Sequence, residues 1–186
     1  MKRIMIIVIS LFLLCGCEKN TDGIDQAMDL RSNLLNGAGC SFVAEITADF
    51  GDKTYTFMLD CLSDKEGDVS FLVQEPEYIE GICGEISHEN GKLTFDDIVL
   101  AFDLKTEDCL SPVSGPWIVV KALRGGYIRS CTKENNLLRI TLNDSYQEDA
   151  LLLDIWLNSS GLPISADIYE ENRRIMVIQV HDFKIL

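Results

Sequence analysis

The clearest chemistry in the sequence belongs to a thiol near the N-terminus. The tetrapeptide Leu14-Cys15-Gly16-Cys17 closes an 11-residue apolar run over residues 4–14, which follows Lys2 and Arg3. This run is too short for a membrane span, which takes roughly 20 apolar residues. A basic start, a short apolar stretch and a small residue before a cysteine are typical of a bacterial lipoprotein signal peptide. We therefore expect residues 1–16 to be removed and Cys17 to carry the lipid.

The other candidates for catalysis or metal binding are weak. His88 and His181 lack metal-ligand spacing, and there is no Gly-x-Ser-x-Gly motif. Asp96 and Asp97 resemble an acid/base pair, but adjacent strand residues point to opposite faces. The acidic stretch 143–149 lacks the glycine and terminal glutamate of an EF-hand loop, so a polar turn is the simpler interpretation. The sequence predicts no enzyme activity, no metal site and no cofactor.

Five further cysteines follow Cys17, and an odd number cannot all pair. Their spacing includes no Cys-x-x-Cys, which argues against zinc and redox motifs. We interpret them as buried thiols of a protein from a reducing habitat. The alternative is one or two disulfides, with Cys40–Cys61 as the first candidate because a hairpin would bring them together. The five are Cys40, Cys61, Cys83, Cys109 and Cys131.

Charge excludes one class of partner. The full chain has 16 basic and 30 acidic side chains. Loss of Lys2 and Arg3 with the signal peptide would leave 14 basic side chains against 30 acidic, a net charge of −16. Such a chain gains nothing from releasing the counterions of a nucleic acid, and it lacks a basic patch for anionic lipids. Attachment to a bacterial membrane, on its extracytoplasmic side, would therefore depend on the lipid at Cys17.

The spacing of apolar residues predicts one domain over 24–186, after a short tether at 17–23. A helix is expected over 24–35, with Asp22 as its cap and Asn36-Gly37 as its left-handed stop. From Cys40 the apolar period changes to two, which indicates strands. A second helix is expected within 111–126, where Ser114 or Gly115 precedes Pro116 and Gly125 ends it. The expected strands cover residues 40–48, 55–61, 69–73, 79–87, 92–96, 98–103, 127–131, 137–143, 150–157, 163–169 and 175–183.

So many consecutive strands with one apolar face must curl around something. We expect a mainly β (α+β) fold: a large curled antiparallel sheet, a half-open barrel of about 10–11 strands, covered by the two helices. This order of elements behind a lipobox resembles the LolA-like superfamily of bacterial lipoproteins and lipoprotein carriers. Segment 68–76, a strand running into a proline, and segment 91–95, a turn and strand, fit that family. The carriers have a basic residue after the proline, where this chain has Glu77 and Glu80.

The resemblance implies two possible functions. In several members the space between sheet and helices holds acyl chains, which implies that this chain binds a lipid-like ligand on its concave face. The candidates for lining that cavity are Phe42, Ile46, Phe57, Phe71 and Trp117. Anchored relatives in spore-forming bacteria include a germination lipoprotein that partners a cell-wall amidase. The alternative is therefore a solid, non-enzymatic interaction module that docks an envelope or cell-wall protein.

Overall fold

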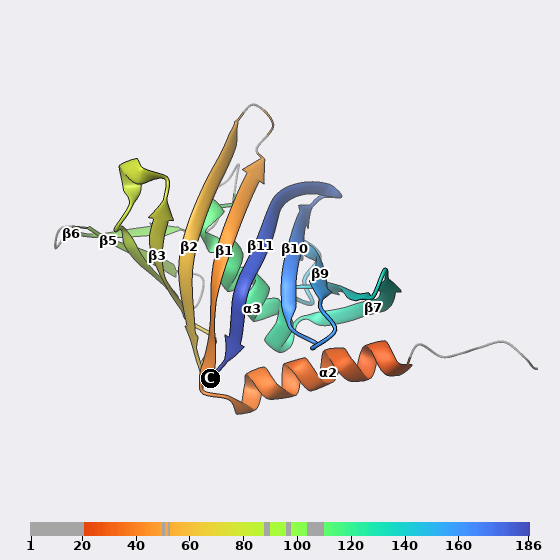
Figure 1. Cartoon of the computed structure of the whole chain (residues 1–186). Helices are drawn as coiled ribbons and strands as arrows, with labels where there is room; N and C mark the ends of the chain where they lie inside the picture. Colours follow the sequence, from red (N-terminus) through yellow and green to blue (C-terminus); the bar gives the residue numbers. More distant parts are fainter. Residues whose placement is uncertain (1–20, 50, 52, 88–89, 96–97, 104–109) are drawn as a thin grey trace, which may run out of the picture.

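One antiparallel sheet of eleven strands makes up most of the fold (Figure 1). The computed structural model describes residues 21–49, 51, 53–87, 90–95, 98–103 and 110–186. The strand order is β6-β5-β4-β3-β2-β1-β11-β10-β9-β8-β7, so the curled sheet does not close and β6 and β7 lie at its two ends. In the described residues, two α-helices accompany it. The predicted mainly β, half-open barrel with an N-terminal and an inserted helix is confirmed.

The sheet consists of two meanders joined by their first and last strands. Strands β1 to β6 pair in sequence order, as do β7 to β11, and β1 pairs with β11. The connection from β6 to β7 must therefore pass from one end of the sheet to the other, and it carries the inserted helix across the concave side. The strands are β1 Gly39–Asp49, β2 Thr54–Asp64, β3 Val69–Glu75, β4 Cys83–Ser87, β5 Asn90–Phe95, β6 Ile98–Asp103, β7 Tyr127–Glu134, β8 Leu137–Asn143, β9 Leu152–Leu157, β10 Pro163–Glu170 and β11 Arg173–Ile185.

Alternation of buried and partly exposed residues gives the sheet its two faces. In β1, Phe42, Ala44, Ile46 and Ala48 are buried and the residues between them are half-buried. Strands β8 and β9 alternate in the same way. A sheet with one apolar face must be covered on that face, and the helices provide the cover.

The inserted helix α3, Gly115–Gly125, lies against the concave face and packs on β2 and β11. Pro116 stands in its first turn, where a missing N–H is harmless. A Cβ at Gly115 would lie 2.8 Å from Cδ1 of Ile178 on β11, so glycine allows the helix backbone to approach the sheet. The single turn of 3-10 helix η2, Pro112–Ser114, precedes α3 and provides its N-cap, Ser114.

The N-terminal helix α2, Thr21–Asn36, runs past the ends of the strands on one side of the molecule and contacts β1, β7 and α3 (Figure 1). Its buried residues, Ala27, Leu30 and Leu34, recur at helical spacing and face the core. No helix in the described residues has the length and apolar character needed to cross a membrane.

Three local predictions are wrong. Asp22 lies within the first turn of α2 and so cannot be its cap. The helix ends at Asn36 as expected, but the residue with positive φ is Gly39, at 141°, and not Gly37. The strand expected from Ile79 begins at Cys83, because Glu77–Ile79 forms the 3-10 turn η1 after Pro76.

Candidate functional site: the concave face of the sheet

One row of inward-facing side chains runs across strands β1 to β6, and its burial decreases toward β6. Directly paired residues of an antiparallel sheet point to the same side. The exposed fraction of the residue is 3% at Phe42, 1% at Cys61 and 4% at Phe71, and it rises to 62% at Leu100. The inner face is therefore covered at its centre and open at the β6 end. The row, in strand order, is Phe42, Cys61, Phe71, Gly84, Leu93 and Leu100.

The open end of the concave face is apolar. Leu93 on β5 is only partly buried, and Ile98 and Leu100 on β6 are each 62% exposed. Leu93 and Leu100 belong to the row of directly paired residues that contains Phe71, and Ile98 lies two residues before Leu100 on the same strand. All three therefore point to the same side of the sheet as Phe71. In the part of the chain that the structure describes, α2 and α3 pack mainly on β1, β2, β7 and β11, away from these residues. This leaves an apolar surface on β5 and β6 that the helices do not fill.

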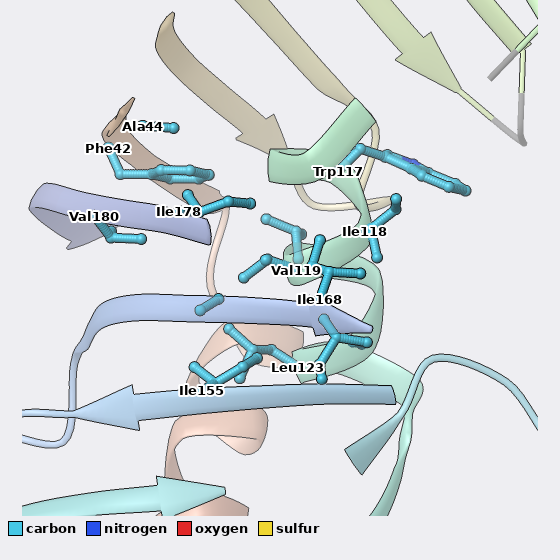
Figure 2. Close-up of a cluster of buried hydrophobic side chains, with 14 of the residues drawn as sticks. Phe42, Ala44, Trp117, Ile118, Val119, Leu123, Ile155, Ile168, Ile178 and Val180 are labelled. Carbon is cyan, nitrogen blue, oxygen red and sulfur yellow. The ribbon is translucent and has the colours of Figure 1, made fainter. Parts of the chain in front are cut away.

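The predicted cavity residues lie in the core beneath or beside α3. Phe42, Ile46, Phe71 and Trp117 are buried, and Phe57 is partly buried against the same cluster. Figure 2 shows Phe42 beside Ile178, while the ring of Trp117 points away from both. Phe42 also stacks on Phe183 with 5.4 Å between ring centroids. Four of the five are thus buried in the hydrophobic core, and the role of all five as ligand lining stays a prediction.

A hollow of about 580 Å³ lies where α3, the end of α2 and the β2–β3 turn meet. Trp117 and Leu35 supply its apolar surface, and Nζ of Lys121 lies 4.9 Å from the centroid of the Trp117 ring. Its lining also includes the cation Arg124 and two carboxylates, Glu66 and Asp68. Because its charges are mixed, this hollow is a weaker candidate for a lipid chain than the surface on β5 and β6.

Two arginines fix the helices to each other. Arg31 of α2 donates to the carbonyl oxygens at the end of α3, at 2.8 Å to Leu123 and 2.7 Å to Gly126. Arg124 of α3 donates in return to the oxygen of Leu34 in α2, at 2.7 Å. We call these reciprocal contacts the arginine clasp. Each guanidinium satisfies carbonyl groups that a helix end leaves without partners.

The remaining predicted chemistry does not gather into a site. His181 lies on β11 with Nε2 3.7 Å from Glu45, and both side chains are about half exposed. His88, Asp96, Asp97, Cys17 and Cys109 lie outside the described residues. Among the described residues, no group of three or more His, Cys, Asp or Glu side chains is arranged to hold a metal ion.

The cysteines in the described part of the chain form no disulfide. Cys40 and Cys61 are buried on neighbouring strands, Cys131 is buried on β7, and Cys83 is exposed on the outer face of β4.

Burial raises the pKa of Cys40 from 9.0 to about 11. Burial also raises the pKa of Cys61, and the neighbouring Asp60 and Cys40 add to this effect. Both thiols are therefore protonated and inert at neutral pH.

These raised pKa values predict a loss of stability at high pH. A thiol whose folded pKa exceeds its unfolded pKa contributes fully below the unfolded value, and this contribution is lost as the pH rises through the folded value. We expect the free energy of unfolding to fall by about 4 kcal/mol between pH 9 and pH 11, with about 2 kcal/mol from each thiol. Chemical denaturation across this range measures it. In the double variant Cys40→Ala/Cys61→Ala, the free energy of unfolding should depend much less on pH over this range. An unchanged pH dependence would mean that other groups cause it.

Comparisons with known proteins give structural matches only. No protein-family model matches the chain, and no curated protein matches its sequence. An uncharacterized conserved protein from Thermus thermophilus matches with a TM-score of 0.47 and 11% identity, over 88% of this chain and 87% of that one. A DUF1329 family protein from Desulfovibrio piger matches with a TM-score of 0.46 and 10% identity, over 89% and 92%.

A LolA superfamily protein is also among the matches. It comes from Nitrosomonas europaea and has a TM-score of 0.45 and 9% identity, over 86% of this chain and 93% of that chain. This is the superfamily that the order of elements in the sequence resembles.

Sequence reasoning missed the residues of the open end, Leu93, Ile98 and Leu100. A signal was present, because residues 98–102 are five consecutive apolar residues, whereas no apolar run in the other strands of the first meander is longer than three. A strand with apolar residues on both faces is either buried on both sides or left with apolar surface uncovered. The second case holds here: Val99, on the opposite face, is 60% exposed.

Proposed function

We propose that the chain is an extracytoplasmic lipoprotein, anchored through a lipid on Cys17, that binds a hydrophobic, lipid-like ligand on the concave face of its sheet. In this proposal residues 1–16 are a signal peptide, residues 17–23 form the tether and residues 24–186 form the binding domain. The domain carries out no catalysis. The ligand enters at the β5–β6 end of the sheet and extends along the concave face toward the predicted lining residues, of which Phe71 is in the same row as Leu93 and Leu100. The other predicted lining residues are Phe42, Ile46, Phe57 and Trp117.

The observation that carries this proposal is the exposed apolar surface on the inner side of β5 and β6. Soluble domains rarely leave several large apolar side chains together in water, and such surfaces usually mark a binding site. Ile98 and Leu100 are each 62% exposed, and the row that contains Leu100 continues inward to the covered Phe71. A hydrophobic ligand lying along this row would extend the existing core outward, which supports a lipid-like occupant.

Native mass spectrometry with organic extraction tests the proposal. Every described helix and strand lies within residues 21–186, so a chain that begins at Glu18 keeps all of them. This chain is purified without detergent and then offered palmitic acid and dipalmitoyl phosphatidylethanolamine. We expect a stoichiometric adduct of lipid mass. A clean protein mass, with no uptake of either probe, would refute ligand binding.

A pair of neighbouring substitutions locates the ligand. We expect Leu100→Lys to weaken binding of the fluorescent probe N-phenyl-1-naphthylamine about tenfold, since a charge on the inner face must be desolvated when the ligand binds. Val99→Lys is the matched control, because Val99 is equally exposed but lies on the outer face of the same strand. Fluorescence titration measures both. Equal affinities for the two variants would place the ligand elsewhere.

A second candidate function has one specific observation in its favour. Strand β6 lies at one end of the sheet order and exposes Ile98, Val99 and Leu100, which cover both of its faces. An end strand with exposed apolar side chains is suited to pairing with a strand of another protein. In that case Leu100→Lys and Val99→Lys would both weaken capture of the partner, and neither would change lipid uptake.

A further inference from the structure

Helix α2 carries an apolar stripe that the core does not use. Ile24 is 49% exposed, Met28 is 47% exposed and Leu35 is 51% exposed. Their spacing of four and seven residues places them on one side of the helix. This side lies next to the buried face formed by Ala27, Leu30 and Leu34, while the exposed Asp25 and Asp29 lie elsewhere on the helix circumference.

An exposed aromatic pair extends the stripe beyond the helix. Arg31 lies between Met28 and Leu35 at the same helical spacing, and its guanidinium donates to the oxygen of Gly126. The next residue, Tyr127, is 52% exposed, and its ring centroid lies 5.8 Å from that of Tyr146, which is 82% exposed. Burial lowers the pKa of Arg31, and Tyr146 lies close enough to offset part of this lowering. The stripe and the two tyrosines therefore form one surface, which we call the α2 face: Ile24, Met28, Leu35, Tyr127 and Tyr146.

The α2 face begins close to the proposed lipid anchor. Only residues 18–20 separate Cys17 from the first residue of α2, Thr21. Four Cα–Cα steps span at most about 14 Å when fully extended, so the start of the helix cannot lie far from the lipid headgroups. The end of the sheet at β6 lies at the opposite end of the molecule (Figure 1).

We propose that the α2 face is a membrane-docking surface, which lays the domain against the bilayer that holds the lipid on Cys17. This proposal rests on the lipid anchor of the proposed function. Half-exposed aliphatic side chains fit the boundary between headgroups and acyl chains, and tyrosines are enriched at that depth. Arg31, with its apolar stem beside Met28 in the stripe and its charge held by backbone carbonyls, is compatible with that position.

Docking of this kind needs only a modest affinity. The lipid keeps the α2 face at a high effective concentration near the bilayer, so a few partly buried side chains are enough to orient the domain. The net charge of −16 expected for the mature chain opposes attraction to anionic headgroups. Apolar contacts therefore hold the docked state, and we expect it to persist in about 0.5 M NaCl, where exposed charges are screened.

Hydroxyl-radical footprinting of the mature lipoprotein in phosphatidylcholine vesicles tests the proposal, because the chain contains matched reporters. Tyr146 and Tyr78 are 82% and 83% exposed, and Leu35 and Leu62 are 51% and 50% exposed. Relative to the water-soluble chain from Glu18, we expect oxidation of Tyr146 and Leu35 to slow about fivefold or more. Oxidation of Tyr78 and Leu62 should change little. Equal rates within each pair on vesicles would overturn the proposal.

Two charge-matched double variants add a second readout. Ile24→Asp/Met28→Asp places two charges in the α2 face, and Ser32→Asp/Asn33→Asp places two on exposed positions outside the stripe. The first variant should oxidise Tyr146 and Leu35 at the soluble rate even when anchored, and the second should keep their protection. If the first variant does not fold, as judged by circular dichroism, the reporter pairs in the unmodified protein still decide the question.

The same samples separate a failure of docking from a failure of the anchor. The intact mass shows whether Cys17 carries acyl groups. If it does not, the lipoprotein proposal fails, and the footprint is repeated on the chain from Glu18 tethered to nickel-chelating lipids by an N-terminal hexahistidine tag. Protection of Tyr146 and Leu35 in that tethered form supports docking by itself, and its absence refutes it. Lipid uptake at β5–β6 involves none of these residues.

Discussion

Replacing Gly84 with alanine is expected to lower the free energy of unfolding by about 2–3 kcal/mol. Gly84 lies on β4, directly opposite Phe71 on β3, and the Phe71 ring covers the glycine. A Cβ at this position would lie 2.1 Å from Cζ of Phe71 and 2.4 Å from Cε1, which is far inside van der Waals contact. Phe71 is only 4% exposed, so its ring cannot move without disturbing packed neighbours.

The same substitution at Gly125 is the control. Apart from its chain neighbours and the backbone of its own helix, nothing lies within 4 Å of a Cβ built at Gly125, so Gly125→Ala should change stability by less than about 1 kcal/mol. Urea denaturation of both variants measures the difference. In a Phe71→Leu background we expect the cost of Gly84→Ala to shrink, since leucine can vacate the space over β4. An equal cost in both backgrounds would show that the Phe71 ring is not the cause.

The architecture could be predicted from the sequence because the apolar period of two can be seen within each strand, and the number of such strands indicates the kind of sheet that they form. A long series of consecutive strand segments, most of them with one apolar face, predicts a large one-faced sheet, and a sheet of this kind needs a cover. Pro116 and Gly125 bracket the second helix in the sequence, and the structure has it at Gly115–Gly125. Boundaries were less predictable where backbone turns compete with strand pairing, as at η1, where Ile79 lies in a 3-10 turn.

The candidate site was less predictable, because it depends on which inward residues the helices cover. Phe42 and Leu100 lie in the same inward row of the sheet, yet one is 3% exposed and the other 62% exposed. Their difference arises from where α3 crosses the sheet, and this path follows from the pairing of β1 with β11, which lie far apart in the chain. No local pattern encodes that pairing. The arginine clasp was missed for the same reason, since it joins residues about ninety positions apart.

Breaking the arginine clasp is expected to have an effect of similar size. We expect Arg31→Met to lower the free energy of unfolding by about 2–4 kcal/mol, because hydrogen bonds from a charged donor contribute about 1.5–3 kcal/mol each and the partly buried carbonyls at the end of α3 lose their partner. Methionine keeps most of the apolar volume of the side chain. The exposed Arg129→Met on β7 is the control, and it should change stability by less than about 0.5 kcal/mol.

A lysine at position 31 separates charge from geometry. Arg31→Lys keeps a cation at the negative end of the α3 dipole. A lysine ammonium lacks the planar guanidinium with which Arg31 donates to both Leu123 and Gly126. We expect it to recover less than half of the stability that Arg31→Met loses, as measured by urea denaturation. Full recovery would mean that the helix dipole alone accounts for the contact.

The clasp also bears on how a ligand enters. If the ligand had to pass beneath α3, the helices would have to separate, and Arg31 and Arg124 would both lose their carbonyl partners. Weakening the clasp would then speed uptake. Entry along the apolar surface of β5 and β6 requires no such separation, so Arg31→Met should leave the association rate of N-phenyl-1-naphthylamine unchanged while lowering stability. A faster rate in this variant would move the entrance from the end of the sheet to the helices.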